Sequence, residues 1–304
     1  MKKDFSKTST GAIILAVIAC ILWSGNFVFA RGADGWINPV GFAFWRWVIA
    51  FTVMLFIARK HIKPGIEILR SDGKVHIAAM GVISVGIYNT LVYRAGHFTS
   101  ANSIALLAAT SPIWTMLLAG VFNLEPLNRF KVAGVFVAFL GALNVILKGN
   151  FADIVHLEFN NGDMLMFVAS WLWAIYSLML KKKPKAMHPS FFLLAIIFYG
   201  LLVLTPLYIL ELIYVGHTPL TLKVLGAYFY VGLGASVVAW MFFNNAVQVI
   251  GAIRTSIIYY SMPIFTGVVS VFTINEHLQH YHIVGFALVF AGILISNRKV
   301  RSQQ

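Results

Sequence analysis

The sequence predicts an all-α integral membrane protein with ten transmembrane helices, arranged as two inverted repeats of five. Three observations predict this fold: the composition, ten apolar segments of spanning length, and a set of residues that recurs halfway along the chain. Of the 304 residues, 60% are hydrophobic and 11% are charged, whereas a soluble domain carries about 25% charged residues. Lipid must therefore surround most of the chain, because a soluble surface needs more polar area.

The formal net charge of +13 does not indicate nucleic-acid binding. The basic residues lie in short loops between apolar segments, so the sequence contains no basic domain. The single cysteine, Cys20, lies within an apolar segment, which excludes an intrachain disulfide framework. We expect a small-molecule substrate and membrane lipids as partners, and no nucleic acid. The oligomeric state stays open, and a monomer is compatible with the sequence.

A helix needs about 20 mainly apolar residues to cross a ~30 Å hydrocarbon core. The segments that meet this requirement are 11–30, 40–59, 75–95, 99–122, 131–148, 161–181, 189–212, 224–247, 252–273 and 281–297. The first segment also resembles a signal peptide, because Lys2, Lys3 and Lys7 precede it. Its apolar run exceeds the roughly 7–15 residues of a signal sequence, and it has a counterpart in the second half. We therefore expect a retained helix.

Lysine and arginine predict the orientation, because short cytoplasmic loops of membrane proteins are enriched in them. With the N-terminus in the cytoplasm, 18 of the 23 lie on the cytoplasmic side, 4 lie opposite, and Arg46 lies within a span. We therefore expect both termini in the cytoplasm and a location in the bacterial inner membrane.

Residues of the first half recur in the second half at a nearly constant offset. The pairs separated by 151 residues are Pro112 and Pro263, Glu125 and Glu276, Gly134 and Gly285, and Gly141 and Gly292. This repeat predicts two domains, residues 11–148 and 161–297, with five spans each. Because five is odd, the second domain would cross the membrane in the opposite direction, an arrangement that supports alternating access.

Three motifs carry a resemblance to a known family. They are Leu22-Trp23-Ser24-Gly25-Asn26, Ser111-Pro112, and the Glu125-x8-Gly134-x6-Gly141 pattern that recurs from Glu276. With them, the chain resembles the drug/metabolite transporters of the EamA type over residues 11–297. The resemblance implies secondary transport, in a family that handles amino acids, nucleobases, drugs and other metabolites. The chain departs from the family at Asn26-Phe27, where small residues are common.

Nine polar or aromatic residues form the candidate substrate-binding set. They are Trp23, Asn26, Tyr88, Asn89, Trp173, Tyr176, Trp240, Asn244 and Tyr259. All lie near the middle of their spans, where polar groups need internal partners. Each asparagine has an alternative role in bonding a neighbouring helix, and each aromatic ring in packing or lipid contact. One shared cavity is favoured because similar pairs fall on equivalent spans of both halves.

Two proline motifs and one arginine complete the candidate site. Ser111-Pro112 and Met262-Pro263 are candidate hinge or gating positions, because proline removes a backbone hydrogen bond and clashes with the preceding turn. The alternative is a simple packing kink. Arg46 either extends to the outer headgroups or serves as a counter-charge for a solute carboxylate or phosphate.

Other chemistries lack the residues that they need. None of the ten Asp and Glu is central in a span, and all nine His lie in loops or at span ends, which disfavours a proton-coupled exporter of quaternary cations. We expect no metal, no cofactor and no enzymatic activity. The leading interpretation is an exporter of small organic metabolites such as amino acids, aromatic ones included. Alternatives are a multidrug or other metabolite permease and, more remotely, a membrane-embedded lipid enzyme using Glu276, His277, His280 and His282.

Overall fold

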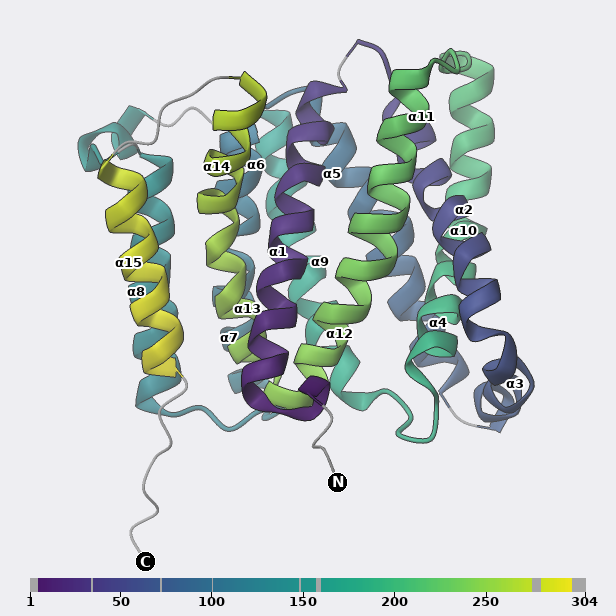
Figure 1. Cartoon of the computed structure of the whole chain (residues 1–304), viewed down its shortest axis with the longest axis horizontal. Coiled ribbons are helices and arrows are strands. Elements are labelled where there is room, and N and C mark those ends of the chain that lie inside the picture. Colours follow the sequence, from purple (N-terminus) through teal and green to yellow (C-terminus); the bar gives the residue numbers. More distant parts are fainter. Residues whose placement is uncertain are drawn as a thin grey trace, which may run out of the picture.

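The computed structural model describes residues 5–33, 35–71, 73–99, 101–147, 149–156, 160–274 and 280–296. In these ranges the chain is helical and contains no strand. Figure 1 shows the long helices standing side by side in more than one layer, with their axes close to vertical. Helix α1 (Ser9–Gly32) begins at the lower edge of this view. We call that end of the bundle the lower face and the opposite end the upper face.

Six helical segments of the described chain are long and apolar enough to cross a membrane. Helices α1 and α10 (Pro189–Tyr214) each provide one of them. The other four combine several elements: α2 (Pro39–Ala58), η2 (Arg59–His61) and α3 (Ile62–Ser71); α4 (Lys74–Gly81), η3 (Val82–Ile87) and α5 (Tyr88–Gly96); α9 (Asn161–Met179) and η5 (Leu180–Lys182); α11 (Leu222–Phe229), η6 (Tyr230–Val238) and α12 (Ala239–Ile250).

The remaining helices are shorter. They are η1 (Phe5–Lys7), α6 (Ala101–Ala108), α7 (Ser111–Val121), α8 (Arg129–Ile146), η4 (Phe151–His156), α13 (Ala252–Ile258), η7 (Tyr259–Ser261), α14 (Met262–Ile274) and α15 (His280–Ser296). Helices α6 and α7 fill the predicted span 99–122, and α13, η7 and α14 fill the predicted span 252–273. Each of these two predicted spans is therefore interrupted near its middle.

Both interruptions come immediately before a proline. Pro112 and Pro263 each occupy the first turn of a new helix, where proline is tolerated because its missing N–H has no intrahelical partner. At the second interruption, side chains of α1 contact backbone carbonyls: Cys20 Sγ lies 3.6 Å from the Ile258 oxygen and Ser24 Oγ donates to the Met262 oxygen at 3.2 Å. A two-residue turn thus precedes α7, and the 3-10 helix η7 precedes α14; a hinge or gating role for the two proline motifs stays a prediction.

Two of the long segments contain a π-helical stretch, η3 and η6. Such stretches shift the backbone register and are frequent at functional sites. Here the wider turns leave carbonyl oxygens to accept bonds from side chains. Ser84 oxygen accepts from Asn89 Nδ2 at 2.8 Å, and Ala235 oxygen accepts from Trp23 Nε1 at 2.8 Å.

Helices α8 and α15 pair closely at one edge of the bundle (Figure 1). A Cβ atom added at Gly134 would lie 2.7 Å from the Gly292 oxygen, and one at Gly141 would lie 2.8 Å from the Gly285 oxygen. Glycine allows helix backbones in a membrane to approach this closely. The glycines of the repeated sequence motif therefore face each other across one helix pair.

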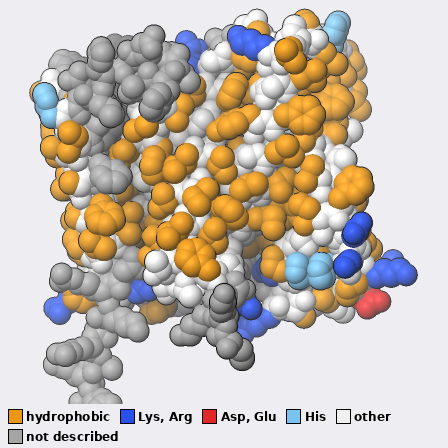
Figure 2. Space-filling model, viewed as in Figure 1, with side chains coloured by type: hydrophobic (Ala, Val, Ile, Leu, Met, Phe, Trp, Pro, Cys, Tyr) orange, Lys and Arg blue, Asp and Glu red, His pale blue; other side chains and the backbone are white. Residues whose placement is uncertain are grey.

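The surface matches a bilayer environment. Figure 2 shows hydrophobic side chains across the middle of the molecule, with Lys and Arg gathered at its upper and lower edges. Large apolar side chains such as Phe56, Leu202 and Ile213 are 71%, 57% and 69% exposed. Exposed apolar area on this scale marks a contact surface, and in a membrane that contact is with lipid.

The close pairing of α8 and α15 predicts that Gly292→Leu destabilises the protein by about 1–3 kcal/mol or more, because the added side chain overpacks the contact. Gly226→Leu is the matched control, since a Cβ at Gly226 meets nothing within 4 Å. Melting of the purified variants in detergent measures the effect. Equal melting temperatures for the two variants would show that this contact is not tight.

Candidate functional site

Aromatic and polar side chains from several helices surround one closed cavity at the centre of the bundle. Its lining residues, here named the central cluster, are Trp23, Asn26, Phe27, Arg46, Tyr88, Asn89, Trp173, Trp240 and Tyr259. Seven of them belong to the substrate-binding set predicted from the sequence, and Arg46 is the predicted counter-charge. Phe27 was not predicted. The free space is about 10 Å³, which is room for about one water molecule. The structure therefore shows this region closed.

The rings of the central cluster pack mainly against one another. The ring centroid of Trp173 lies 5.2 Å from Trp23, 5.0 Å from Tyr88, 5.4 Å from Trp240 and 5.7 Å from Tyr259. Tilted and edge-on pairs at such distances contribute about 0.5–1.5 kcal/mol each beyond burial. Trp173 Nε1 is buried and has no hydrogen-bond partner among the described residues. The cluster thus contains a donor that is not used in the closed state.

Arg46 lies at one side of the central cluster and is only 1% exposed. The atoms bonded by its guanidinium are Ser236 Oγ (2.7 Å from Nε) and, from Nη1, Asn26 Oδ1 (3.1 Å), Asn89 Oδ1 (3.0 Å) and Tyr93 Oη (2.7 Å). The Tyr93 hydroxyl in turn donates to Asn26 Oδ1 at 2.6 Å. The alternative in which Arg46 extends to the outer headgroups is therefore wrong, because its charge points into the protein.

Every hydrogen-bonding partner of Arg46 in the described chain is a neutral oxygen, and no described carboxylate lies within 4 Å. Burying a charge costs several kcal/mol unless it is paired. Neutral oxygens reduce this cost but do not remove the net charge. Arg46 is therefore an unneutralised cation beside a group of aromatic rings, and it favours an anionic ligand group.

Tyr176 and Asn244 do not line the central cavity, although the sequence grouped them with it. They bond to each other, with the Tyr176 hydroxyl donating to Asn244 Oδ1 at 2.7 Å. The Tyr176 ring lies 5.3 Å from Trp173 and 5.1 Å from Trp240. The pair therefore forms a layer just below the central cluster, on the side of the lower face.

Below this layer is a larger cavity of about 510 Å³, here named the vestibule. It is bordered by α3, by the loop before α10 and by α12, and Asn244 is one of its lining residues. Its volume lies within the range of roughly 300–1,000 Å³ that is typical of small-molecule pockets. Asn244 thus separates an open cavity at the lower face from the closed central cluster.

The upper ends of α1, α5 and α9 close the bundle on the other side of the central cluster. A Cβ atom added at Gly96 would lie 2.3 Å from the Ala30 oxygen, and one at Gly162 would lie 2.8 Å from the Ala95 oxygen. Backbones this close leave no passage between these helices. These three helices therefore pack tightly above the central cluster. A cavity of about 490 Å³ at the upper face is lined by residues such as Trp36, His97 and His217, and the vestibule lies below the cluster.

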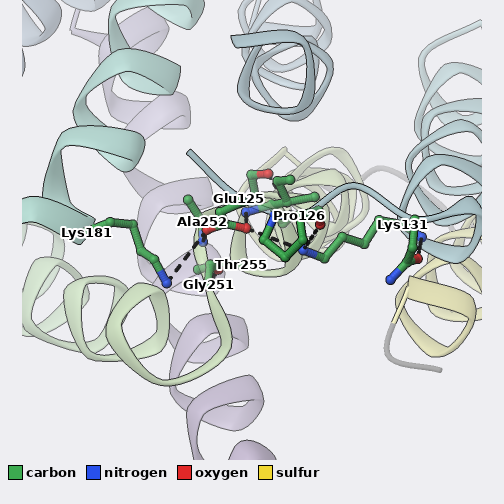
Figure 3. Close-up of polar contacts among 10 residues, drawn as sticks. Glu125, Pro126, Lys131, Lys181, Gly251, Ala252 and Thr255 are labelled. Atoms are coloured by element: carbon green, nitrogen blue, oxygen red, sulfur yellow. Dashed lines mark hydrogen bonds and ion pairs between the residues drawn. The ribbon is translucent and has the colours of Figure 1, made fainter. Parts of the chain in front are cut away.

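A buried carboxylate joins several helices at the lower face (Figure 3). Glu125, 8% exposed, accepts from the Ala252 nitrogen at 2.6 Å, where α13 begins, and lies 3.6 Å from Lys131 Nζ and 3.8 Å from Lys181 Nζ. A carboxylate is favourable there because the first N–H groups of a helix lack intrahelical partners. Glu125 thus connects the lower ends of α8, α9 and α13.

The proline motifs lie outside the central cavity. Ser111 and Met262 are both buried, and neither they nor Pro112 and Pro263 line the cavity. The Ser111 hydroxyl has no hydrogen-bond partner among the described residues. These residues start α7 and α14 instead.

Of the residues considered for a lipid enzyme, Glu276 and His277 lie outside the described residues.

Several members of the site were not predicted from the sequence. Phe27 lines the same cavity as the predicted residues. Trp47 meets Trp240 edge-on at 5.0 Å, and Tyr93 and Ser236 bond Arg46. Helical spacing could have identified two of them. Tyr93 follows Asn89 by four residues and Ser236 precedes Trp240 by four, so each shares a helix face with a predicted residue.

The contacts of Glu125 predict that Glu125→Gln lowers stability by about 1.5–3 kcal/mol, which is typical of losing a charged hydrogen-bond partner. The glutamine retains one acceptor oxygen for α13 but loses both ion pairs. Glu67→Gln is the control, since Glu67 is exposed at the same face. Thermal unfolding in detergent measures both; unfolding of Glu125→Gln at the temperature of the control would show that the ion pairs contribute nothing.

Three relatives show what this chain is similar to. "Uncharacterized transporter YyaM" of Bacillus subtilis is 26% identical over 92% of both chains. "Riboflavin transporter" of Brucella anthropi is 28% identical over 63% of both chains. "Probable terminal-alkyne amino-acid exporter" of Streptantibioticus cattleyicolor is 24% identical over 95% of this chain and 94% of that protein.

A solved crystal structure of another protein has the same fold, with a TM-score of 0.75 and 15% identity over 95% of this chain and 98% of the other. The sequence profile of the EamA-like transporter family matches residues 10–147 and again residues 160–298. Together with the six long apolar helices, these matches identify a multi-pass membrane protein that belongs to the EamA-like transporter family.

Proposed function

We propose that this protein is a secondary transporter that exports amino acids, aromatic ones included, from the cytoplasm by alternating access. The observation that carries the proposal is the buried guanidinium of Arg46, which has only neutral partners and lies beside the aromatic rings of the central cluster. An amino acid supplies what this site lacks, namely a carboxylate for the cation and an apolar side chain for the rings. The name of the Streptantibioticus relative also points to amino-acid export.

The bonds of Arg46 indicate how the solute would bind. A carboxylate can accept two parallel bonds from a guanidinium, and such bonds are roughly twice as strong as neutral ones. On binding, it would replace Asn26 and Asn89 as acceptors for Arg46. Their released amide oxygens could then accept from the α-ammonium group of the same solute. The exchange makes use of both asparagines that bond Arg46 in the closed state.

The aromatic rings would hold the side chain of the solute. Each ring pair contributes about 0.5–1.5 kcal/mol, so a few contacts give weak binding from which the solute can leave. The free space of about 10 Å³ is too small for an amino acid. Transport therefore requires the rings around Trp173 to separate, and the unpaired Trp173 Nε1 would become available to a solute oxygen.

We further propose ten spans, in two inverted domains of residues 11–148 and 161–297. In addition to the six long segments, the spans would be α6 with α7, α8, α13 with α14, and α15. Two contacts support the symmetry: Gly134 meets Gly292 while Gly141 meets Gly285, as expected when two copies of one motif pack around a twofold axis. The family profile also matches twice.

The lower face would lie in the cytoplasm of a bacterial inner membrane, together with both termini. The distribution of Lys and Arg along the sequence supports this orientation. The vestibule then opens toward the cytoplasm, and α1, α5 and α9 pack closely at Gly96 and Gly162 on the outer side of the central cluster. This is the arrangement in which an exporter would take up its solute.

A second candidate function is a permease for other ring-bearing metabolites or drugs. The observation that favours it is the central cluster itself, because its rings would stack on any flat solute, and the Brucella relative is named for riboflavin. The two candidates differ in their need for Arg46. Export of an amino acid requires its charge, whereas stacking of a neutral ring does not.

The proposal predicts that Arg46→Gln reduces export of L-phenylalanine at least tenfold, because loss of a charged hydrogen bond costs about 1.5–3 kcal/mol. Cells are fed a phenylalanine-containing dipeptide, and the amino acid that they release is measured at equal protein levels. Arg59→Gln, at the exposed end of the same span, should export normally. Normal export by Arg46→Gln would exclude a carboxylate-binding role and favour the ring-permease alternative.

A further inference from the structure

Every titratable side chain that lines the vestibule is basic. The titratable side chains that line it are His61, Lys183, Lys185 and His188, and no described Asp or Glu is among the lining residues. The other polar lining residues are the amides Asn244, Asn245 and Gln248. Such a lining favours an anionic group and offers amide oxygens and nitrogens beside it.

His188 is held in a fixed orientation at the mouth of the vestibule. Its ring stacks on His61 with centroids 3.6 Å apart and planes at 6°. Its Nδ1 accepts from the Ser190 nitrogen at 3.3 Å and so caps the start of α10. In the neutral ring the proton is therefore on Nε2, which leaves Nε2–H as a donor for a ligand.

Lys183 has donor capacity that the protein does not use. Its Nζ donates to the Met187 oxygen at 2.8 Å and lies 5.6 Å from the centroid of the Phe192 ring. An ammonium group has three donors, and no described carboxylate lies within 4 Å of this one. Burial lowers the pKa of Lys183, and burial together with His61 and Lys183 lowers that of His188. An anion beside both groups would offset these costs.

We propose that the vestibule is a second solute-binding site, in which Lys183 and His188 hold the carboxylate of a small organic solute before it reaches the central cluster. The inference rests on the proposed export function. Asn245 also lines this cavity, and its Oδ1, which has no partner among the described residues, would accept from the ammonium group of a zwitterion. The Phe192 ring, also in the lining, provides apolar contact.

The position of the vestibule connects it to the central cluster. Asn244 lines the vestibule and bonds Tyr176, whose ring contacts Trp173 and Trp240. A solute in the vestibule therefore lies next to the hydrogen bond that closes the lower side of the central cluster. When this bond opens, the carboxylate passes from Lys183 and His188 to Arg46.

The test measures binding of 3-phenylpropionate, a carboxylate probe, to the purified full chain in phosphatidylcholine nanodiscs by saturation-transfer NMR. We expect Lys183→Gln to raise the dissociation constant at least fivefold and Lys182→Gln, an exposed neighbour outside the lining, to leave it within twofold. His188→Asn, which retains a side chain suited to helix capping, should also weaken binding. Phenethylamine, which has no carboxylate, should not respond to Lys183→Gln.

Repeating the titration in the Arg46→Gln chain removes the cation of the central cluster, and the effect of Lys183→Gln should persist there. The proposal is overturned if the probe does not bind, or if Lys183→Gln and His188→Asn both bind it like Lys182→Gln. It is also overturned if phosphatidylglycerol in the nanodisc abolishes probe binding, because the anion held by Lys183 would then be a lipid headgroup. Probe binding without amino-acid export would refute the proposed function and leave the vestibule site standing.

Discussion

The buried charge of Arg46 is the constraint on which the centre of this protein depends. A guanidinium inside the bundle costs several kcal/mol unless it is well bonded. Arg46 lies in α2, and its partners come from α1, α5 and η6. Four segments must therefore meet at one point. The π-helical stretches contribute to this meeting, because η6 contains Ser236 and η3 ends just before Asn89. The aromatic rings then pack around the bonded cation.

The contacts above the central cluster are tighter than those below it. Above the central cluster, backbones touch at Gly96 and Gly162. Below it, one hydrogen bond between Tyr176 and Asn244 separates the central cluster from the vestibule. Opening the lower side requires the loss of that bond and some ring contacts, whereas opening the upper side requires helices to move apart. Glu125 connects the lower ends of three helices and so limits how they move.

Much of the fold followed from the sequence because lipid imposes a simple pattern of long apolar segments. A helix interruption at Pro112 and Pro263 was among the expected alternatives. Seven residues of the central cluster were predicted because they lie near the middle of their spans. The position of Arg46 along its span did not determine where its side chain points, because a long side chain can reach either the lipid headgroups or the protein interior. The vestibule was not predicted, because His61 and His188 meet only after folding. Nothing in the residue types marked the π-helical stretches.

The central claim is that the buried cation recognises the carboxylate of the solute. Competition by L-phenylalaninamide, which retains the ring and the amino group but replaces the carboxylate with a neutral amide, tests it most directly. The measurement is efflux of radiolabelled L-phenylalanine from preloaded vesicles containing the wild-type protein, with either competitor present on the loaded side. Unlabelled L-phenylalanine should inhibit efflux, and the amide should inhibit it at least tenfold more weakly. Equal inhibition by the two compounds would contradict the claim.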